Sequence, residues 1–382
     1  MKIAHISISA PFIDSWGYQE NLLTRYLQDE GVQNYIIASA NDFPSYLKQE
    51  VIDEIKAKGT TYDLDGIVVR RIPTKKVSTS MAITHGLMDV LKEIQPDAIF
   101  HHNLNCTSMP VAARYARKHG IKMVVDNHAD PINMTRNKLW AFIYYRILTG
   151  TSVKLHQKDI YKAYGVTHSR CDFIHDYYGL TRRKIDFLPI GADVKQADRI
   201  AAKEELRIKY CFGVNDFVVV SGGKMGKGKG TDHLIAAAEG LAKEYPLIRL
   251  VLFGRFEDAE TEAQAKGSPV TQVHGWCDRQ KTLELLKMAD VACWPIHHTT
   301  LIEDAVSVCT PVINRKTGTT EHLIDGNGVW TQDGSVESLR KALLSMLNQT
   351  EQEREAMAEA CMRKREEISY VTVANKLIKD IQ

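Results

Sequence analysis

The sequence predicts an α/β protein with two Rossmann-like domains, each built around a parallel sheet. Runs rich in β-branched residues alternate with amphipathic helical segments, and this series begins at residue 2 and again after residues 186–193. A chain of 382 residues can bury two separate cores. Strands that alternate with helices give parallel sheets whose ligands bind beyond the carboxyl ends of the strands. We therefore expect two such domains with their sheets facing across a cleft.

The first series of elements occupies residues 1–195. Its first strand, residues 2–8, is followed by Trp16-Gly17-Tyr18, which opens a helix with an apolar stripe. The other predicted strands of this domain are residues 35–38, 66–70, 98–101 and 122–126, and its helices include residues 81–94 and 111–119.

The second series occupies residues 196–360. Its predicted strands are residues 217–221, 249–253, 270–274, 291–294 and 310–314, and its helices are residues 232–244, 280–288 and 336–347. The sequence after residue 351 is helix-prone, with an interruption near residues 369–373, and no strand follows it. We expect residues 361–382 to form a C-terminal helix that braces the N-terminal domain.

Composition indicates an ordinary soluble protein. Hydrophobic residues make up 44% of the chain and charged residues 25%. No run approaches the roughly 20 apolar residues that span a bilayer, and the amino terminus has no apolar signal core, so we expect a cytoplasmic protein. The seven cysteines are scattered without a C-x-x-C pair, which predicts reduced thiols rather than a zinc site or disulfides.

The two halves of the chain differ in charge. Residues 1–195 carry 25 basic and 20 acidic residues, a balance of +5, and the remainder carries 24 and 27, a balance of −3. This asymmetry is either chance or a preference of the first half for an anionic acceptor or lipid surface. The basic residues form no stripe interleaved with aromatics, so no nucleic-acid partner is expected.

The most informative stretch is residues 218–232, VVVSGGKMGKGKGTD, where a buried strand leads through a glycine-rich loop into a helix. Glycines let the backbone approach an anion, and a helix start offers unpaired N–H groups and partial positive charge. The P-loop pattern fails because position 230 is glycine where a Ser or Thr should hold magnesium, and the alternating glycines do not match the dinucleotide fingerprint. The loop is either a phosphate-binding loop with Lys224 and Lys229 or a basic surface turn.

Several segments together resemble the retaining nucleotide-sugar glycosyltransferases of the GT-B fold, specifically glycosyltransferase family 4. They are residues 17–21, 126–128, 188–193, 223–224, 229–230, 253–255, 273–276, 310–313 and 321–328. Their order and spacing carry the resemblance, which covers nearly the whole chain. It implies a GT-B fold in which residues 1–195 bind the acceptor and residues 196–360 bind the nucleotide-sugar donor.

The resemblance also assigns roles to individual residues. In this family a basic pair grips the donor diphosphate, and Lys224 and Lys229 occupy those positions. Gly17, in the strand–loop–helix of the other domain, is expected to approach the same diphosphate. His128 follows a predicted strand end and is expected to contact the donor sugar as a catalytic residue; the alternative is a structural histidine. His101 and His102 follow the preceding strand and are candidates for acceptor contact.

One segment departs from the family pattern. The family carries two glutamates eight positions apart, and counting back from residues 309–313 places Asp304 at the later one and Ile296 at the earlier one. The first acid is therefore missing. We expect Asp304, as a catalytic-site carboxylate, or its neighbour Glu303 to accept hydrogen bonds from the ribose diol. The residues that fill the shortened turn, expected to contact the donor sugar or ribose, are His298, Thr299 and Thr300.

No metal or cofactor is expected beyond the donor substrate. Fixed cations and helix N–H groups can stabilise the charge that develops on a nucleoside diphosphate leaving group. The D-x-D triplet, Asp63-Leu64-Asp65, precedes its strand and is interpreted as a surface turn.

The predicted function is a metal-independent, hexosyltransferase-like retaining glycosyltransferase in surface polysaccharide or glycoconjugate biosynthesis. It would act on a glycan or a lipid-linked acceptor. The alternatives are a non-catalytic GT-B nucleotide-binding subunit and a GT-B isomerase or phosphorylase.

Residues 136–148, RNKLWAFIYYRIL, mix aromatic and basic side chains. Two interpretations are open: an amphipathic helix that makes peripheral contact with the inner membrane face, or a helix that packs into the core.

Overall fold

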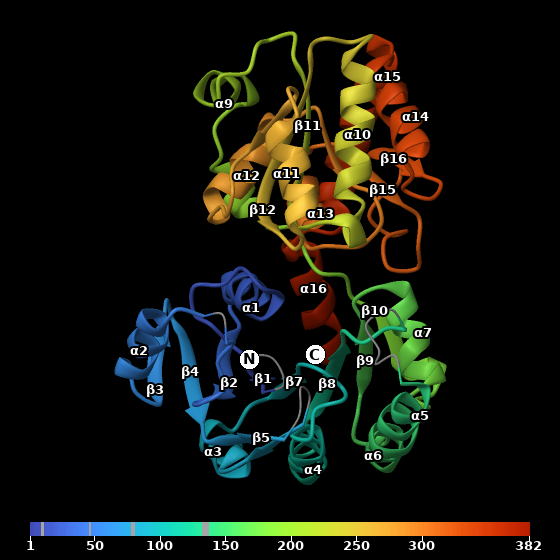
Figure 1. Ribbon diagram of the computed structural model, residues 1–382. Helices are drawn as coiled ribbons and strands as arrows, with labels where there is room; N and C mark the ends of the chain where they lie inside the picture. Colours follow the sequence, from blue (N-terminus) through green and yellow to red (C-terminus); the bar gives the residue numbers. More distant parts are fainter. Residues whose placement is uncertain (9–10, 46, 78–80, 132–136) are drawn as a thin grey trace. The chain divides into compact units, whose positions relative to one another are not determined.

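The computed structural model describes residues 1–8, 11–45, 47–77, 81–131 and 137–382, which divide into two compact units (Figure 1). The first unit comprises Met1–Pro189 together with Val373–Gln382, and the second comprises Ile190–Thr372. The units therefore divide after Pro189, close to the expected boundary at residue 195, and the last ten residues return to the first unit.

The first unit contains an eight-stranded sheet in the order β10-β9-β8-β7-β1-β2-β4-β3. All neighbouring pairs are parallel except β3 and β4. Its strands are β1 (Lys2–Ser7), β2 (Gln33–Ser39), β3 (Thr61–Leu64), β4 (Ile67–Ile72), β7 (Ala98–His101), β8 (Lys122–Asn127), β9 (Lys162–Gly165) and β10 (Ile185–Phe187). A separate two-stranded ribbon pairs β5 (Thr74–Lys76) with β6 (Ala82–Thr84).

Helices connect these strands. They are α1 (Gln19–Asp29), α2 (Gln49–Ala57), α3 (Leu87–Ile94), α4 (Met109–His119), α5 (Lys138–Ala141), the π-helix η1 (Phe142–Thr149), α6 (Gly150–His156), α7 (His168–Asp176) and the short 3₁₀ turn η2 (Arg182–Lys184). Strand order reverses at β1, since β2 and β4 lie on one side of it and β7 and β8 on the other. The carboxyl ends of β1 and β7 thus form the switch point where such sheets bind ligands.

The second unit contains a six-stranded parallel sheet in the order β13-β12-β11-β14-β15-β16. Its strands are β11 (Phe217–Met225), β12 (Ile248–Phe256), β13 (Thr271–Val273), β14 (Val291–Trp294), β15 (Val312–Arg315) and β16 (Gly328–Thr331). Here the strand order reverses between β11 and β14, so their carboxyl ends form the corresponding switch point.

The helices of this unit are α8 (Val194–Asp198), α9 (Lys203–Lys209), the 3₁₀ turn η3 (Lys227–Lys229), α10 (Thr231–Ala242), α11 (Ala259–Gly267), α12 (Arg279–Met288), α13 (Leu301–Ser307), α14 (Val336–Leu347) and α15 (Glu351–Glu367). Together with the sheets, these alternating elements confirm the predicted α/β class with two sheet-containing units.

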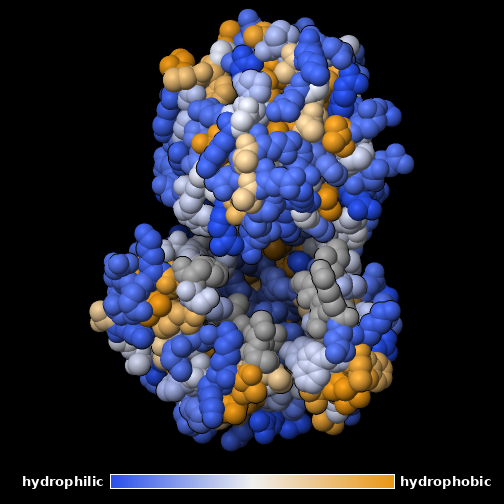
Figure 2. Space-filling view, in the orientation of Figure 1, coloured by the Kyte–Doolittle hydropathy of each residue, from blue (hydrophilic) through white to orange (hydrophobic). Residues whose placement is uncertain are grey.

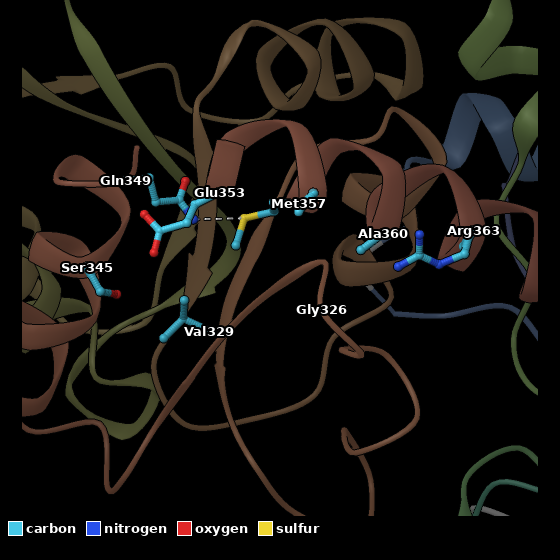
Figure 3. A pocket seen from close by; sticks show the side chains of 9 residues that line it. Gly326, Val329, Ser345, Gln349, Glu353, Met357, Ala360 and Arg363 are labelled. Atoms are coloured by element: carbon cyan, nitrogen blue, oxygen red, sulfur yellow. Dashed lines mark hydrogen bonds between the residues drawn. The ribbon is translucent and has the colours of Figure 1, made fainter. Parts of the chain in front are cut away.

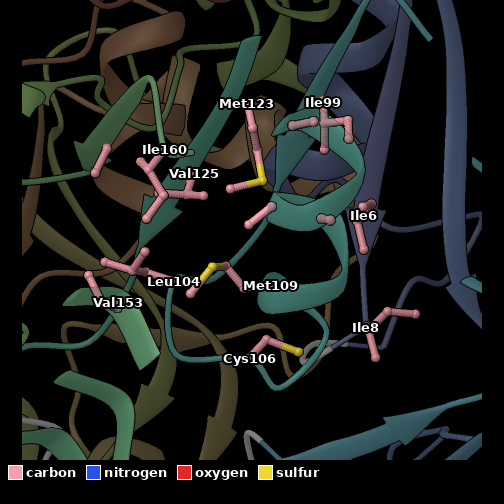
Figure 4. Packing of buried hydrophobic residues seen from close by; sticks show 14 of the residues in the cluster. Ile6, Ile8, Ile99, Leu104, Cys106, Met109, Met123, Val125, Val153 and Ile160 are labelled. Carbon is pink, nitrogen blue, oxygen red and sulfur yellow. The ribbon is translucent and has the colours of Figure 1, made fainter. Parts of the chain in front are cut away.

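The sheets are buried on their faces by alternating side chains. Along β11, Val218 and Val220 enter one hydrophobic cluster and Val219 enters the other, as expected when successive side chains point to opposite faces. In the first unit, side chains from β1, β7 and β8 pack against α4 in one large cluster (Figure 4). Continuous apolar strands are typical of parallel sheets covered on both faces, which is why the sequence pattern predicted them.

The last helix, α16 (Tyr370–Ile381), starts in the second unit and ends in the first. The Asp380 carboxylate accepts hydrogen bonds from the Lys162 ammonium (2.7 Å) and the Tyr164 hydroxyl (2.6 Å), and Lys376 pairs with Asp186 (2.7 Å). The structure thus replaces the single helix expected over residues 361–382 with two helices, α15 and α16, and only the last ten residues belong to the first unit.

One predicted helix is wrong at its start. The sequence predicts a helix over residues 81–94, whereas the structure has strand β6 followed by helix α3, which begins after Gly86. Gly86 has a φ of 81°, a left-handed conformation that separates the two elements. The short strands β9 and β10 were not predicted from the sequence.

Candidate functional site

The glycine-rich loop of the second unit is a compact turn at the carboxyl end of β11. The Gly226 N–H donates to the Thr231 hydroxyl (3.1 Å), and the Lys229 and Thr231 N–H groups both donate to the Gly226 carbonyl (2.9 and 3.2 Å). Gly230 has a φ of 71° and forms the N-cap of α10. The predicted order of strand, glycine loop and helix is therefore present, with the loop at the switch point of the sheet.

The three lysines of this loop differ in their partners. Lys227 lies 2.6 Å from the Glu260 carboxylate and is occupied. Lys224 is exposed and Lys229 is half-buried, and neither forms an ion pair with any residue that the structure describes. Two of the three cations are thus available to an anion, and they are the two that the sequence assigned to a diphosphate.

Three glycines lie near the carboxyl ends of adjacent strands beside this loop. Gly223 in β11, Gly254 in β12 and Gly275 after β13 all have positive φ. Gly223 and Gly254 are in register, and the Gly254 N–H donates to the Gly275 carbonyl (2.5 Å). A Cβ at Gly254 would lie 2.2 Å from the Gly223 carbonyl oxygen, so no side chain fits there. The result is a strip of bare backbone that a ligand can approach closely.

The segment after β14 lies against the glycine loop. A Cβ on Gly230 would sit 2.9 Å from Pro295, and one on Gly223 would sit 3.1 Å from Leu301. Burial lowers the pKa of His297, and the charge of Lys229 lowers it further, so His297 belongs to the same cluster. His297 was not assigned a role from the sequence. Its position between strand β14 and His298 was the one sequence feature that pointed to this site.

Within this segment, His298 and Glu303 form a pair. The His298 Nε2 lies 2.9 Å from the Glu303 Oε1; Glu303 is buried and His298 is half-buried. Glu303 Oε2 has no hydrogen-bond partner among the described residues. Thr299 is half-buried and Thr300 is exposed. These four predicted donor-contact residues are close in the chain, and the structure adds that the first two are joined by a hydrogen bond.

Asp304 has a different environment from the one expected. Its Oδ1 lies 2.5 Å from the Arg279 Nη1, and the Arg279 Nη2 lies 3.5 Å from Asp193. The Asp304 side chain is buried, and burial raises its pKa although Arg279 opposes this shift. The open carboxylate that a ribose acceptor requires is thus replaced by an ion pair with a guanidinium, a long-range contact that sequence spacing could not reveal.

In the first unit, His128 follows β8 and contacts a buried carboxylate. The His128 Nε2 lies 3.5 Å from the Asp126 Oδ2, and the His128 side chain is 30% exposed. The same oxygen of Asp126 lies 2.8 Å from the His102 Nδ1, and the Asn103 N–H donates to the Asp126 Oδ1 (2.6 Å). His128 is therefore held at the carboxyl end of the strand, where the sequence placed it.

The prediction that His101 and His102 reach the acceptor is wrong. Both side chains are buried. The His101 Nε2 lies 2.8 Å from the Ser108 hydroxyl, and the His102 N–H donates to the Ile6 carbonyl (2.9 Å) in continuation of the sheet. Strand β7 has the predicted bounds, but both rings turn into the interior, where His101 meets Ser108 and His102 meets Asp126 (2.8 Å).

Gly17 is exposed immediately before Tyr18, the N-cap of α1. The loop that leads to it is anchored by Arg71, whose guanidinium donates to the Phe12 carbonyl (3.0 Å) and lies 3.0 Å from Asp14. Lys58 also pairs with Asp14 at 2.8 Å. The sequence did not identify this anchor, because it joins the loop to β4 through residues far apart in the chain. The contact between Gly17 and a diphosphate stays a prediction.

In the Asp63-Leu64-Asp65 triplet, the first two residues end β3 and Asp65 begins the tight turn to β4; both aspartates are exposed, in agreement with a surface turn. The Gly66 N–H donates to the Asp63 carboxylate (2.8 Å), and Asp65 has a φ of 52°. Within the described ranges, no group of three or more His, Cys, Asp and Glu side chains is arranged to hold a metal ion. None of the described helices is both long and apolar enough to cross a membrane.

A separate cavity of about 460 Å³ lies among β16, α14 and α15 (Figure 3). Small and apolar side chains such as Val329, Ala360 and Met357 line much of it. The Gln349 side chain, which donates to the Met357 sulfur at 3.5 Å, also lies there. Because none of the residues lining it belongs to the glycine loop or to the segment after β14, it is not part of the site described above.

Solved structures of known proteins that resemble this chain show its fold. The chain resembles the structure of Anabaena Alr3699/HepE in complex with UDP, with a TM-score of 0.70, 15% identity and coverage of 99% of both chains. It also resembles WaaG, a glycosyltransferase involved in lipopolysaccharide biosynthesis, with a TM-score of 0.61, 18% identity and coverage of 100% of this chain and 99% of WaaG. The architecture is that of GT-B glycosyltransferases.

The sequence comparisons are more specific for the second unit. Residues 202–363 match the family model of glycosyl transferases group 1. The chain is 26% identical over 240 residues to the putative glycosyltransferase EpsD of Bacillus subtilis (strain 168), a match that spans 59% of each chain. Fold and family match together support a GT-B glycosyltransferase, and the matched residues contain the glycine loop and the segment after β14.

Proposed function

We propose that the protein transfers a sugar from a nucleoside-diphosphate sugar to a glycan or lipid-linked acceptor, with retention at the anomeric carbon and without a metal. The observation that carries the proposal is the glycine loop at the β11–β14 switch point, where Lys224 and Lys229 have no carboxylate partner among the described residues. HepE has been crystallised with UDP, with UDP and glucose, and with UDP-glucose. UDP-glucose is therefore the donor to test first.

The chemistry follows from the charge of the leaving group. When the glycosidic bond to the nucleotide breaks, negative charge develops on the diphosphate, and fixed cations with helix N–H groups stabilise it in the transition state. Lys224, Lys229 and the first turn of α10 supply these groups. His128, whose Nε2 lies 3.5 Å from the Asp126 carboxylate, is the proposed donor-sugar contact. His298, Thr299, Thr300 and Glu303 are proposed to contact the donor sugar or ribose.

The test is donor binding followed by turnover. A ligand that binds only the folded state raises the melting temperature, so UDP, GDP, ADP and UDP-glucose are screened by thermal shift. Slow hydrolysis of the stabilising donor is then followed by NMR, in which release of the α-anomer from an α-linked donor indicates retention. The same rate in EDTA supports metal independence, whereas complete loss in EDTA with recovery in magnesium contradicts it.

The same experiments separate the alternatives. A non-catalytic nucleotide-binding subunit would be stabilised by a nucleotide but would release no sugar with any donor and acceptor. An isomerase would return an altered nucleotide sugar, and a phosphorylase would require inorganic phosphate. Absence of stabilisation by every nucleotide would contradict all of these functions, since each needs the anion site.

A membrane-associated acceptor is the finer part of the proposal, and one surface of the first unit supports it. Leu139, Phe142 and Leu155 are exposed on α5, η1 and α6, the first and last to 70% and 73%. Figure 2 shows apolar residues gathered over these elements. The exposed basic residues among them are Lys138, Arg146, Lys154 and Lys158. No Asp or Glu occurs between residues 131 and 158.

Both sequence interpretations of this segment apply to different faces of it. Tyr144 and Tyr145 pack into the core, whereas Trp140 and Phe142 are exposed; Arg136 lies outside the described residues. An apolar face with a purely basic rim fits an anionic lipid surface, which adds electrostatic attraction to apolar insertion. We propose that this surface, α5–η1–α6, contacts the membrane that holds the acceptor.

Vesicle sedimentation tests this contact. The wild-type protein is expected to co-sediment with phosphatidylglycerol vesicles but not with phosphatidylcholine vesicles, and the Trp140→Ala/Phe142→Ala variant is expected to stay in the supernatant. Trp276→Ala, which removes a tryptophan that is 84% exposed on the second unit, serves as the matched control. Equal binding by all three proteins would assign the contact elsewhere.

A further inference from the structure

A chain of buried polar side chains runs across four adjacent strands of the first unit, behind His128. It passes from Asp126 on β8 to His102 after β7, then to His5 on β1 and Asn34 on β2. The Asp126 Oδ2 lies 2.8 Å from the His102 Nδ1, the His102 Nε2 lies 3.3 Å from the His5 Nδ1, and the His5 Nε2 lies 3.1 Å from the Asn34 Oδ1. All four side chains are buried.

The hydrogen bonds of Asn34 fix the protons along this chain. The Asn34 Nδ2 donates to two backbone carbonyls, those of Thr24 (2.9 Å) and Val32 (3.1 Å), so its Oδ1 is the acceptor that faces His5. His5 must then carry its proton on Nε2 and accept at Nδ1. That acceptor requires a proton on the His102 Nε2, and the Asp126 carboxylate requires one on the His102 Nδ1. His102 is therefore an imidazolium and His5 a neutral ring.

The electrostatics of the buried groups agree with this assignment. Burial lowers the pKa of His102, but the Asp126 charge and hydrogen bond outweigh it and raise the pKa overall. Burial and the charge of His102 lower the pKa of His5 to about 3. Burial raises the pKa of Asp126, but the two histidines outweigh it and hold the pKa well below its usual range. The charge of Glu20 on α1 also raises the pKa of His102. The charge of His102 lowers the pKa of His101, and the charge of Asp126 raises it.

We propose that His102 is a positioning residue for His128: as a buried imidazolium it balances and fixes the Asp126 carboxylate, and Asp126 in turn holds the His128 ring at the end of β8. The inference rests on the proposed contact between His128 and the donor sugar. Loss of the positive charge at position 102 therefore loosens the position of His128.

Replacement of His102 by asparagine isolates the charge. The Asn amide can donate to Asp126 as the His102 Nδ1 does, but it carries no charge, so Asp126 loses its buried cationic partner. The pH–rate profile of His102→Asn is therefore expected to differ from that of the wild type, and kcat is expected to fall more than KM changes.

The matched control is His101→Asn. His101 is the neighbouring buried histidine, and its Nε2 bonds to Ser108 rather than to Asp126. Loss of packing is similar in the two variants, but only His102→Asn removes the charge beside Asp126. We expect the His101→Asn pH profile to match that of the wild type. Equal shifts in both variants, or no shift in His102→Asn, would overturn the proposal.

Histidine NMR tests the inference without relying on turnover. Long-range ¹⁵N–¹H spectra of the wild-type protein at pH 7 are expected to show both nitrogens of His102 protonated and His5 neutral with its proton on Nε2. A neutral His102 at pH 7 would overturn the proposal. Asp126→Asn is the second variant, in which His102 is expected to give the spectrum of a neutral ring.

These spectra also separate failure of the inference from failure of the proposed function. If no donor is turned over, the protonation of His102 in the wild type and in Asp126→Asn still decides the proposal: a doubly protonated His102 in the wild type that becomes neutral in Asp126→Asn supports it, and a neutral His102 in the wild type overturns it. Binding of UDP, measured by calorimetry, tests the glycine loop of the second unit independently.

Discussion

At the scale of single residues, the candidate site consists of groups whose partners decide whether they are available to a ligand. Lys227 is neutralised by Glu260, whereas Lys224 and Lys229 have no carboxylate partner among the described residues. Local sequence sufficed to select this loop, because glycines and lysines between a strand and a helix meet an anion through local geometry alone. The partner of Asp304 could not be predicted, since Arg279 reaches it from another helix.

Replacement of Lys224 and Lys229 by alanine tests the anion site. Each substitution removes a charge-assisted hydrogen bond, a loss of about 1.5–3 kcal/mol in binding free energy. We expect the double variant to lose most of the thermal stabilisation by nucleotide while its unliganded melting temperature changes little. Lys227→Ala is the control and should bind nucleotide like the wild type. Equal nucleotide affinity of the double variant and the wild type in calorimetry would reduce the loop to a surface turn.

Asp304→Asn decides between two roles for this carboxylate. The substitution keeps the size of the side chain but leaves Arg279 with Asp193, at 3.5 Å, as its one carboxylate partner among the described residues. Breaking a buried ion pair costs about 3 kcal/mol of unfolding free energy. Chemical denaturation measures this loss. If Asp304 also accepts from the ribose, nucleotide affinity of the folded variant falls as well; unchanged affinity would assign Asp304 a purely structural role. Asp193→Asn, on the far side of Arg279, is the control for loss of a charge in this cluster.

At the scale of elements, the sequence predicts strands and helices where apolar residues are continuous. It does not predict which side chains meet across neighbouring strands. The apolar runs of β1, β7, β8 and β11 can be recognised in the sequence, because parallel strands are covered on both faces. The chain of polar groups behind His128 depends on the register of four strands, β8-β7-β1-β2, so His5 and Asn34 gave no signal in isolation. The sequence also could not show that this register buries His102 between His5 and Asp126, and His102 was therefore assigned to acceptor contact.

The buried His5 ring makes the stability of the first unit depend on pH. Its folded pKa of about 3 lies below the unfolded value of about 6.5, so its contribution is fully present above pH 6.5 and is lost as the pH falls toward 3, by up to about 1.4 kcal/mol per pH unit. His102 has the opposite sign: its raised pKa contributes stability below about pH 6.5, which is lost as the pH rises through the folded pKa.

His5→Gln separates these effects, because Gln can still donate to Asn34 but does not titrate. We expect unfolding free energies measured by urea denaturation to fall less steeply between pH 6.5 and 4 in this variant than in the wild type. The alkaline side of the profile should keep its slope. Identical acid slopes in the two proteins would show that His5 does not control the acid sensitivity.

At the scale of the whole molecule, the chain returns to its first unit at the end. Leu377 is fully buried, and Asp380 binds Lys162 and Tyr164 on β9. The second unit holds the glycine loop and the whole of the region that matches the family model, residues 202–363. Stability of the first unit and nucleotide binding by the second should therefore respond differently to changes in α16.

Truncation after Thr372 tests this division. Removal of Val373–Gln382 exposes the apolar surface that these residues cover and leaves the ammonium of Lys162 without Asp380, so the first unit is expected to melt at a lower temperature. UDP affinity of the second unit should persist. Leu377→Ala should produce a smaller loss of about 3 kcal/mol, and Lys379→Ala, at an exposed position of the same helix, should be neutral. Calorimetric scanning with and without UDP measures the melting of both units in one experiment. If truncation reduces UDP binding as much as it reduces the stability of the first unit, the two units do not fold independently.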